Sequence, residues 1–287
     1  MVTALLSGLV NGAAYALFAM GIVIVYKNSR TFNLAQGEFA TVAAYVAYVI
    51  LKSTSLPYSV ALIAALVAAV AMALAIERLV IWPLRRASRV DPLVATAAIT
   101  SSAIALETIL SGGASYVLPA IVGGRAFTIG GTAVSYEWVL VIGVVLATVV
   151  LGGIFFSNSM NGIAIRAAAS EPTAARIIGI AMGRASMLSW GIAGLLGGLG
   201  GILLAPVTTV SPGEFTASAL VAALTATVLG GLTSIVGACV GGLVIGVAES
   251  LSITYIGNAI PGAASLVELG IVLIVLLVRP SGLLGAR

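Results

Sequence analysis

The chain has 287 residues, of which 61% are hydrophobic and only 8% charged, about a third of the charged fraction typical of soluble domains. Its mean hydropathy of +1.21 and its long uncharged runs exclude an ordinary soluble enzyme and predict an integral membrane protein. The sequence has no histidine and one cysteine, Cys239, which excludes an intrachain disulfide, a zinc site and Ser-His-Asp catalysis. Neither Lys27 nor Lys52 follows a glycine, so a P-loop is excluded and any energy from ATP must come from another subunit.

Stretches with at most one charged residue predict helices that cross a bilayer, because about 20 helical residues span its hydrocarbon layer. The first stretch has neither a basic start nor a small-residue cleavage site, so we expect it to remain as a helix. A later stretch, 215–248, is broken by Gly230 and Gly231 and predicts two short crossings or a re-entrant hairpin. The other expected crossings are 1–26, 33–51, 53–76, 92–112, 138–165, 185–213 and 263–278.

These stretches predict an all-α fold, a polytopic membrane helix bundle of about eight transmembrane helices with a re-entrant or broken helix pair. We expect one transmembrane domain over residues 1–287. Alternating strands of the kind that build a membrane barrel are not evident in the sequence.

The basic residues predict the orientation, because Lys and Arg favour the cytoplasmic side of a membrane. If the basic connections at 27–30, 78–89 and 166–184 share one side with the C-terminus, that side holds all but two of the 13 positive residues. Only Lys52 and Arg125 then lie opposite. We therefore expect a multi-pass protein of the cell (inner) membrane with its N-terminus outside and its C-terminus cytoplasmic. The pI near 9.5 follows from this topology and gives no reason to predict nucleic-acid binding.

Three glutamates are expected inside or close to the bilayer. The uncharged run after Glu38 is too short for a complete crossing, and so is the run after Glu268, while Glu107 lies within the stretch 92–112. Ionisable residues at such depth often mark a transport path or a pairing partner. The alternative is that each lies near an interface and reaches headgroups or water.

The tripeptide Gly-Glu-Phe occurs twice, at 37–39 and at 213–215, each time at a predicted helix start. If these helices enter from opposite sides, the tripeptides predict an inverted repeat whose half-helix ends meet at a central site. The alternative is chance identity, since the flanking residues match weakly. The transport-path candidates are therefore Glu38, Gln36, Gly37, Glu107, Glu214 and Glu268.

The longest basic inner connection predicts a short helix of about two turns. Ser170 suits its N-cap, Glu171 and Pro172 suit its first turn, and Gly179 suits the position after its C-cap. Such a helix has a small apolar face that fits a partner's groove, although a solvated connector is the alternative. The predicted face consists of Ala174, Ala175 and Ile178.

Seven segments occur in one order along the chain: GLVNGAAYAL (8–17), NLAQGEF (33–39), ER and PLR (77–85), 166–180, VLGGLTSI (228–235), GGLVIGVAES (241–250) and RPSGLLG (279–285). With these segments the chain resembles, nearly end to end, the permease subunits of branched-chain amino-acid ABC importers of the Liv type. The resemblance implies a fold and a transport function of that family. It also implies that 166–180 contains the coupling helix that contacts the ATPase, with Arg166, Glu171, Pro172, Ala175 and Gly179 as candidate residues.

The same resemblance implies partners: two ABC ATPase subunits, a second permease that is identical or homologous, and an external solute-binding protein. It implies translocation of branched-chain or related amino acids as small-molecule substrates, with no cofactor bound by this chain and no catalysis of its own. Related permeases handle urea, short amides or other amino acids, and the residues do not separate these substrates. The family commonly has histidine at the position of Gln36, so a role for that position in protonation does not carry over.

Two other classes of function remain open at this point. An ion- or proton-coupled secondary transporter would act without an ATPase and would use Glu38, Glu107 and Glu268 as a relay. The absence of histidine and of acidic pairs on one segment weighs against it. The other class is a channel-like or purely structural membrane subunit.

Overall fold

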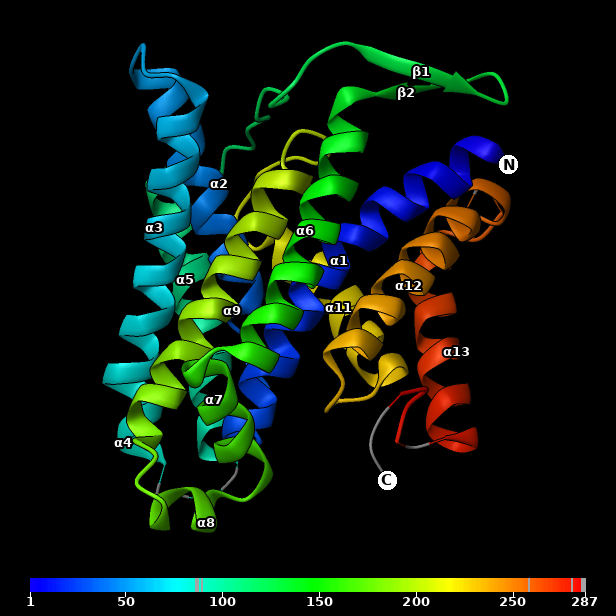
Figure 1. The fold of residues 1–287 in the computed structure, drawn as a ribbon. Coiled ribbons are helices and arrows are strands. Elements are labelled where there is room, and N and C mark those ends of the chain that lie inside the picture. The colour runs from blue at the N-terminus through cyan, green and yellow to red at the C-terminus, as the bar shows by residue number, and fades with distance from the viewer. Residues whose placement is uncertain (86–87, 89, 258, 280, 285–287) are drawn as a thin grey trace.

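The computed structural model describes residues 1–85, 88, 90–257, 259–279 and 281–284, which form a helical bundle with one small hairpin of strands (Figure 1). The hairpin pairs β1 (Arg125–Ile129) with β2 (Thr132–Ser135) in antiparallel register. The helices are α1 (Val2–Ser29), α2 (Gln36–Ser53), α3 (Tyr58–Ile76), the π-helix η1 (Glu77–Ile81), α4 (Trp82–Leu84), α5 (Asp91–Ser111), α6 (Tyr136–Asn158), α7 (Met160–Ser170), α8 (Pro172–Ile177), α9 (Met182–Leu204), α10 (Glu214–Ala217), α11 (Ala219–Gly230), α12 (Ile235–Tyr255) and α13 (Ala263–Val278).

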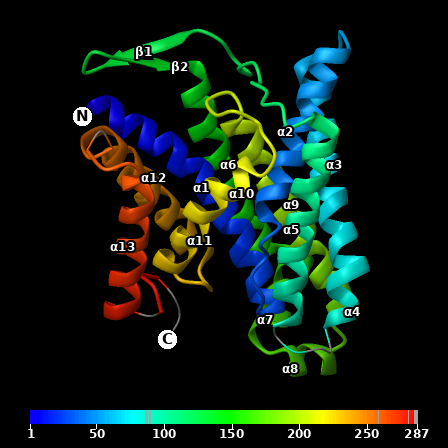
Figure 2. The same cartoon turned by 180° about the vertical axis from the view of Figure 1, so that it is seen from behind.

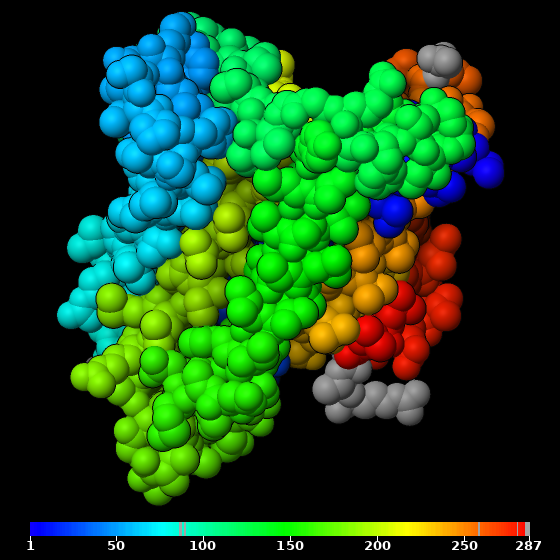
Figure 3. Space-filling view, turned by 45° about the horizontal axis from the view of Figure 1, so that its top comes forward, coloured from blue at the N-terminus to red at the C-terminus, as the bar shows by residue number. Residues whose placement is uncertain are grey.

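The bundle has two different ends. The hairpin and the N-terminus lie at one end, and α4 and α8 lie at the other (Figures 1 and 2). The hairpin crosses its end of the bundle in the space-filling view, and the hydroxyl groups of Thr3 and Thr132 are 2.7 Å apart (Figure 3). Lys52 at the end of α2 and Arg125 in β1 lie at the hairpin end, as their separation from the other basic residues predicts.

Within the described residues, six helical segments are long and apolar enough to cross a membrane: α1, α3 to α4, α5, α6, α9 and α12. The paired α10 and α11 (214–230) and α13 are shorter apolar helices. The predicted all-α membrane bundle is therefore confirmed, whereas eight crossings stay a prediction. The break predicted at Gly230 and Gly231 is present, because α11 ends at Gly230 and Gly231 has a φ of +105° before α12.

Close backbone approach holds α1 against α12. A Cβ added at Gly12 would lie 2.7 Å from the carbonyl oxygen of Gly242, and one added at Gly8 would lie 2.7 Å from the Cα of Val247. Small residues allow this proximity where lipid supplies no hydrophobic drive between helices. Gly8 and Gly12, which lie four residues apart on α1, therefore allow a tight crossing of the two helices.

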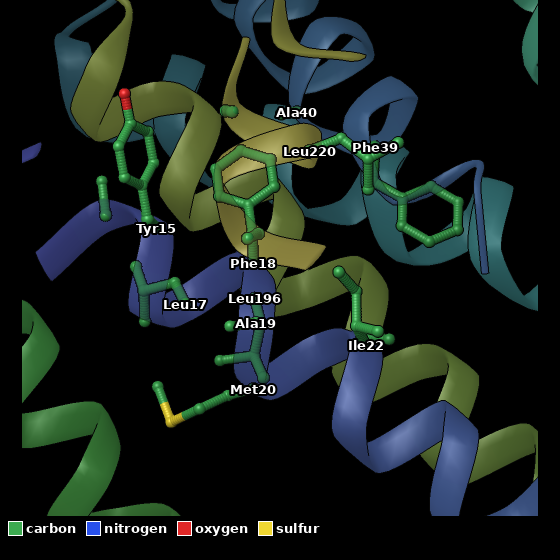
Figure 4. Packing of buried hydrophobic residues seen from close by; sticks show 14 of the residues in the cluster. Tyr15, Leu17, Phe18, Ala19, Met20, Ile22, Phe39, Ala40, Leu196 and Leu220 are labelled. Atoms are coloured by element: carbon green, nitrogen blue, oxygen red, sulfur yellow. The ribbon is translucent and has the colours of Figure 1, made fainter. Parts of the chain in front are cut away.

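The core is built around α1. Phe18 of α1 is fully buried and lies among Leu196 of α9, Leu220 of α11 and Ala40 of α2 (Figure 4). A Cβ added at Gly200 of α9 would lie 2.5 Å from the Phe18 ring, so the aromatic side chain fills the space that this glycine leaves. The packing fixes α2 and α11 on either side of α1, which positions their starting residues.

Candidate functional site

The chain leaves helical structure between α1 and α2 and forms a buried polar segment. Arg30 at the end of α1 has a left-handed φ of +54°, and α2 begins at Gln36, deep in the bundle. Asn33, Gln36 and Glu38 are all fully buried. The segment places polar side chains where a continuous membrane helix would place apolar ones. Non-helical backbone at membrane depth is tolerated where protein surrounds it, because its polar groups then find partners away from lipid.

Hydrogen bonds fasten this segment to α9. The Gln36 side-chain amide donates to the carbonyl oxygen of Ala193 at 2.9 Å, and its Oε1 accepts from Asn33 Nδ2 at 3.2 Å. The Gln36 amide packs against a glycine on each of two helices. A Cβ added at Gly197 of α9 would lie 2.9 Å from the amide nitrogen, and one added at Gly21 of α1 would collide with it. Gln36 is therefore a packing and positioning group between α1 and α9.

The start of α2 meets the start of α10. Thr216 Oγ1 donates a 2.5 Å hydrogen bond to Glu38 Oε1, and a Cβ added at Gly37 would lie 2.7 Å from the Thr216 Cα. The two Gly-Glu-Phe tripeptides thus lie side by side, as the sequence predicts. From this point α2 runs toward the hairpin end, whereas α10 leads into α11 and the opposite end (Figure 2). The opposed directions are those of an inverted repeat, and the repeat itself stays a prediction.

Glu107 of α5 joins the same site. Its Oε2 accepts a 3.4 Å hydrogen bond from the backbone N–H of Gly213, just before α10, and its carboxyl group lies beside that of Glu38. Glu214 is half-buried at the first position of α10. The structure therefore brings together five of the six transport-path candidates: Gln36, Gly37, Glu38, Glu107 and Glu214.

Two carboxyl oxygens at this site are buried without a partner among the described residues. They are Glu38 Oε2 and Glu107 Oε1. A buried polar atom that makes no hydrogen bond is costly, and the cost is larger for a charged group. Such atoms are suited to receive a donor that arrives with a ligand, and an ammonium group is the donor that matches two neighbouring carboxyl groups.

Glu268 lies elsewhere. It is buried on α13, near Glu249 of α12 and Tyr15 of α1, so it does not share the site at the start of α2. Sequence reasoning missed Glu249 as a candidate, and it also missed Asn33 and Thr216. Asn33 and Thr216 each lie within a few residues of a Gly-Glu-Phe tripeptide, which was the signal that could have found them.

The predicted helix at Ser170–Gly179 is present in a shorter form, and its N-cap was wrong. Ser170 is the last residue of α7, Glu171 occupies the cap position, and α8 begins at Pro172. The predicted end is confirmed: Gly179 has a φ of +84°, and the N–H of Ile180 donates to the carbonyl oxygen of Ala175 at 2.9 Å. Arg166 lies on α7, one helix before α8.

The predicted apolar face of this helix was also wrong in part. Ala175 is turned into the chain and is 2% exposed, whereas Ala174 is exposed. Ile178 is 73% exposed, as predicted, and Ile177, which was not predicted, adds to the exposed apolar surface at 80%. Ala175 was assigned to the outer face because its spacing fits there, but the packing of α8 against α7 and α9 uses that small side chain.

A groove with basic walls runs beside α8. It has a volume of about 480 Å³, and its walls include Arg176 of α8 and Arg85 after α4. The Arg85 guanidinium lies 3.5 Å from the centre of the Trp82 ring. The end of the bundle opposite the hairpin thus presents two exposed isoleucines next to a positively charged groove.

The chain matches a family model over residues 4–277, and that model describes the permease component of branched-chain amino acid transport systems. It is 31% identical to the high-affinity branched-chain amino acid transport system permease protein BraD of Pseudomonas aeruginosa, over 98% of this chain and 94% of that protein. It is 30% identical to the permease protein LivH of Escherichia coli, over 97% and 94%. A probable LivH of Methanocaldococcus jannaschii is also 30% identical, over 94% and 88%.

A chain in the structure of PsaBC from Streptococcus pneumoniae in complex with Fab has a similar fold. The TM-score is 0.54 at 15% sequence identity, and the match covers 96% of this chain and 91% of that one. At this identity the likeness concerns the arrangement of helices alone.

Proposed function

Because the chain belongs to the family of permease components of branched-chain amino acid transport systems, we propose that it is the membrane-spanning subunit of an ATP-driven importer for branched-chain or related amino acids. The observation that carries this proposal is the match over nearly the whole length of the chain. The six apolar helices agree with a multi-pass membrane protein.

The importer has partners on both sides of the membrane. Two ABC ATPase subunits bind the end that holds α8, a second permease completes the membrane part, and a solute-binding protein delivers the amino acid at the hairpin end. The chain itself binds no cofactor and hydrolyses no ATP. The N-terminus lies outside and the C-terminus in the cytoplasm of the cell (inner) membrane, as the distribution of basic residues supports.

In this proposal α8 is the element that transmits motion of the ATPases. Ile177 and Ile178 enter an apolar groove of the ATPase, and Arg176 contributes charge at its edge. A partner shifts a conformational equilibrium only through its difference in affinity for the two states, so the closed ATPases must bind α8 in one position of the bundle better than in the other.

The start of α2 is then the central site. The unwound segment before α2, the short α10 and the N-terminal ends of both helices are the features that line substrate sites in transporters built from broken helices. Glu38 and Glu107 supply carboxyl oxygens that accept from the ammonium group of an amino acid. Alternation of access follows when α2 and α10 move apart.

The experiment that tests this function uses the complete importer in proteoliposomes, with ATP inside and the solute-binding protein and labelled leucine outside. Uptake of leucine is expected to require ATP and to persist when an uncoupler removes the proton gradient. Uptake that continues without ATP and collapses with the uncoupler would contradict the proposal and favour a secondary transporter. Uptake that does not saturate would favour a channel.

A further inference from the structure

A cavity of about 490 Å³ lies between α2, α3 and α5, under the segment that follows α5. This volume falls within the range of about 300–1,000 Å³ that is typical of small-molecule sites. Aliphatic side chains form most of its wall, with Val42 and Val46 from α2, Met72 from α3 and Leu106 from α5. The cavity is therefore suited to an aliphatic group.

Three tyrosines close the cavity toward the hairpin end. The rings of Tyr48 and Tyr116 stack with centroids 4.3 Å apart, and Tyr45 meets Tyr116 edge-on at 5.8 Å. Tyr116 is paired through its backbone with Val210, at 2.9 and 2.8 Å, on the segment that leads to α10. The aromatic cover is thus tied to the same chain segment whose Gly213 holds Glu107.

The cavity has one buried carboxyl group. Glu107 lines it, is 8% exposed, and has one oxygen held by the Gly213 N–H while the other, Oε1, has no partner among the described residues. The buried hydroxyl of Tyr45, also a lining residue, makes no hydrogen bond there either. An aliphatic wall with an unpaired carboxyl oxygen describes a site for an alkyl ammonium compound.

We propose that this cavity is a binding site for the amino acid on its way through the permease. The ammonium group donates to Glu107 Oε1, and the branched side chain packs against Val42, Val46 and Met72. The inference rests on the proposed transport function and adds the place where the aliphatic side chain is selected. Lys52, whose Nζ donates to the hydroxyl of Tyr48 at 2.9 Å, offers a positive charge to the carboxylate at the outer mouth.

A lipid acyl chain is the competing occupant, because Val49 and Leu110 at the edge of the cavity are 54% and 78% exposed. An acyl chain accounts for the aliphatic wall but leaves Glu107 Oε1 without a donor. The amino acid accounts for both the wall and the carboxyl oxygen, and it is therefore the occupant that the side chains favour.

The test compares leucine and alanine uptake by the complete importer in proteoliposomes, each expressed per ATP hydrolysed. Val46→Phe fills the cavity and is expected to lower the leucine-to-alanine ratio about tenfold, since discrimination by size in an apolar pocket reaches about 10- to 200-fold. The matched control is Val67→Phe, on an exposed part of α3 outside the cavity, which is expected to leave the ratio unchanged. Met72→Ala enlarges the cavity and is expected to raise phenylalanine uptake relative to leucine.

Glu107→Gln tests the polar end of the site. The amide oxygen keeps the hydrogen bond from Gly213, but an NH2 group then takes the place of Oε1 and cannot accept from the ammonium group. Leucine uptake per ATP is expected to fall about tenfold because a hydrogen bond to a charged group is lost. Its control is Glu137→Gln on α6, since Glu137 is also buried, with one oxygen held by the N–H of Val122 at 3.1 Å and the other without a partner among the described residues. This control is expected to retain uptake.

The outcomes separate the two proposals. If the unmodified importer takes up leucine but neither Val46→Phe nor Met72→Ala changes any uptake ratio, the cavity proposal is overturned and the transport function stands. An unchanged ratio together with loss of a co-purifying lipid in Val46→Phe would assign the cavity to an acyl chain and overturn it as well. If the unmodified importer takes up no amino acid, the proposed function fails first.

Discussion

The start of α2 and the short helix α8 are both irregular parts of the chain, but they are held in opposite ways. At the start of α2, Gln36 and Glu38 are fully buried and bonded to α9 and α10. At α8, by contrast, Ile177 and Ile178 are largely exposed and only Ala175 is buried. Hydrogen bonds hold the buried polar segment in place, because each unmet one is costly, whereas the exposed face of α8 gains binding energy only when a partner covers it.

This difference assigns the folding stability of the bundle to the start of α2 and its coupling to the ATPase to α8. Changes at the start of α2 should affect the stability of the bundle, and changes on the outer face of α8 should affect assembly and coupling alone. The expected effects on folding stability therefore decrease from Gly37 through Thr216 to the two isoleucines of α8.

Gly37→Leu is expected to have the largest effect. Its Cβ would lie 2.7 Å from the Cα and 2.9 Å from the backbone nitrogen of Thr216, and backbone atoms cannot move aside as a flexible side chain can. We expect a loss of about 3 kcal/mol or more in stability, the upper part of the range for overpacking, measured by thermal unfolding and yield in detergent. Gly143→Leu on α6 is the matched control, because nothing lies within 4 Å of its added Cβ. Equal yields of the two variants would show that α2 and α10 do not meet as described.

Thr216→Val is expected to have an intermediate effect. The substitution keeps the shape of the side chain but removes the donor to Glu38 Oε1, which leaves both oxygens of that buried carboxyl group without a partner among the described residues. The expected loss is about 2 kcal/mol, within the range for an orphaned polar group. Thr216→Ser retains the hydroxyl and should recover most of the stability. A serine variant as unstable as the valine variant would assign the effect to the methyl group instead.

The sequence predicted the hydrophobic crossings because helix length and charge are local properties. It also predicted the meeting of the two Gly-Glu-Phe tripeptides, because a repeated tripeptide links two segments that lie far apart in the sequence. Asn33 and Thr216 were missed, because nothing local says which helix lies opposite a polar side chain. The family likeness and the tripeptides thus located the site, whereas the side chains that hydrogen-bond to Gln36 and Glu38 could be identified only from the packing of the helices.

The error at Ser170 has a local cause. Residues 167–169 are alanines, the strongest helix formers, so α7 continues through Ser170 and leaves no place for an N-cap there. Proline then disfavours helical backbone in the residue before it, and Glu171 accordingly has φ −140° and ψ 89°. Capping residues at this position were read correctly as a boundary but were placed one residue too early.

The double variant Ile177→Ser and Ile178→Ser is expected to have the smallest effect on stability and a large one on transport. Both side chains are exposed, so their removal changes the free energy of unfolding by less than about 0.5 kcal/mol, as for surface substitutions in general. If α8 enters an apolar groove of the ATPase, the same change removes two anchors from an interface in which a few residues carry most of the binding energy. Co-purification with the ATPase and ATP-dependent leucine uptake should therefore be lost while thermal unfolding is unchanged.

Met160→Ser is the control, because Met160 is 85% exposed at the start of α7 but lies outside α8. Retained uptake in the double variant would place the coupling contact elsewhere on the α4 and α8 end, and the basic groove of Arg85 and Arg176 would be the next surface to alter.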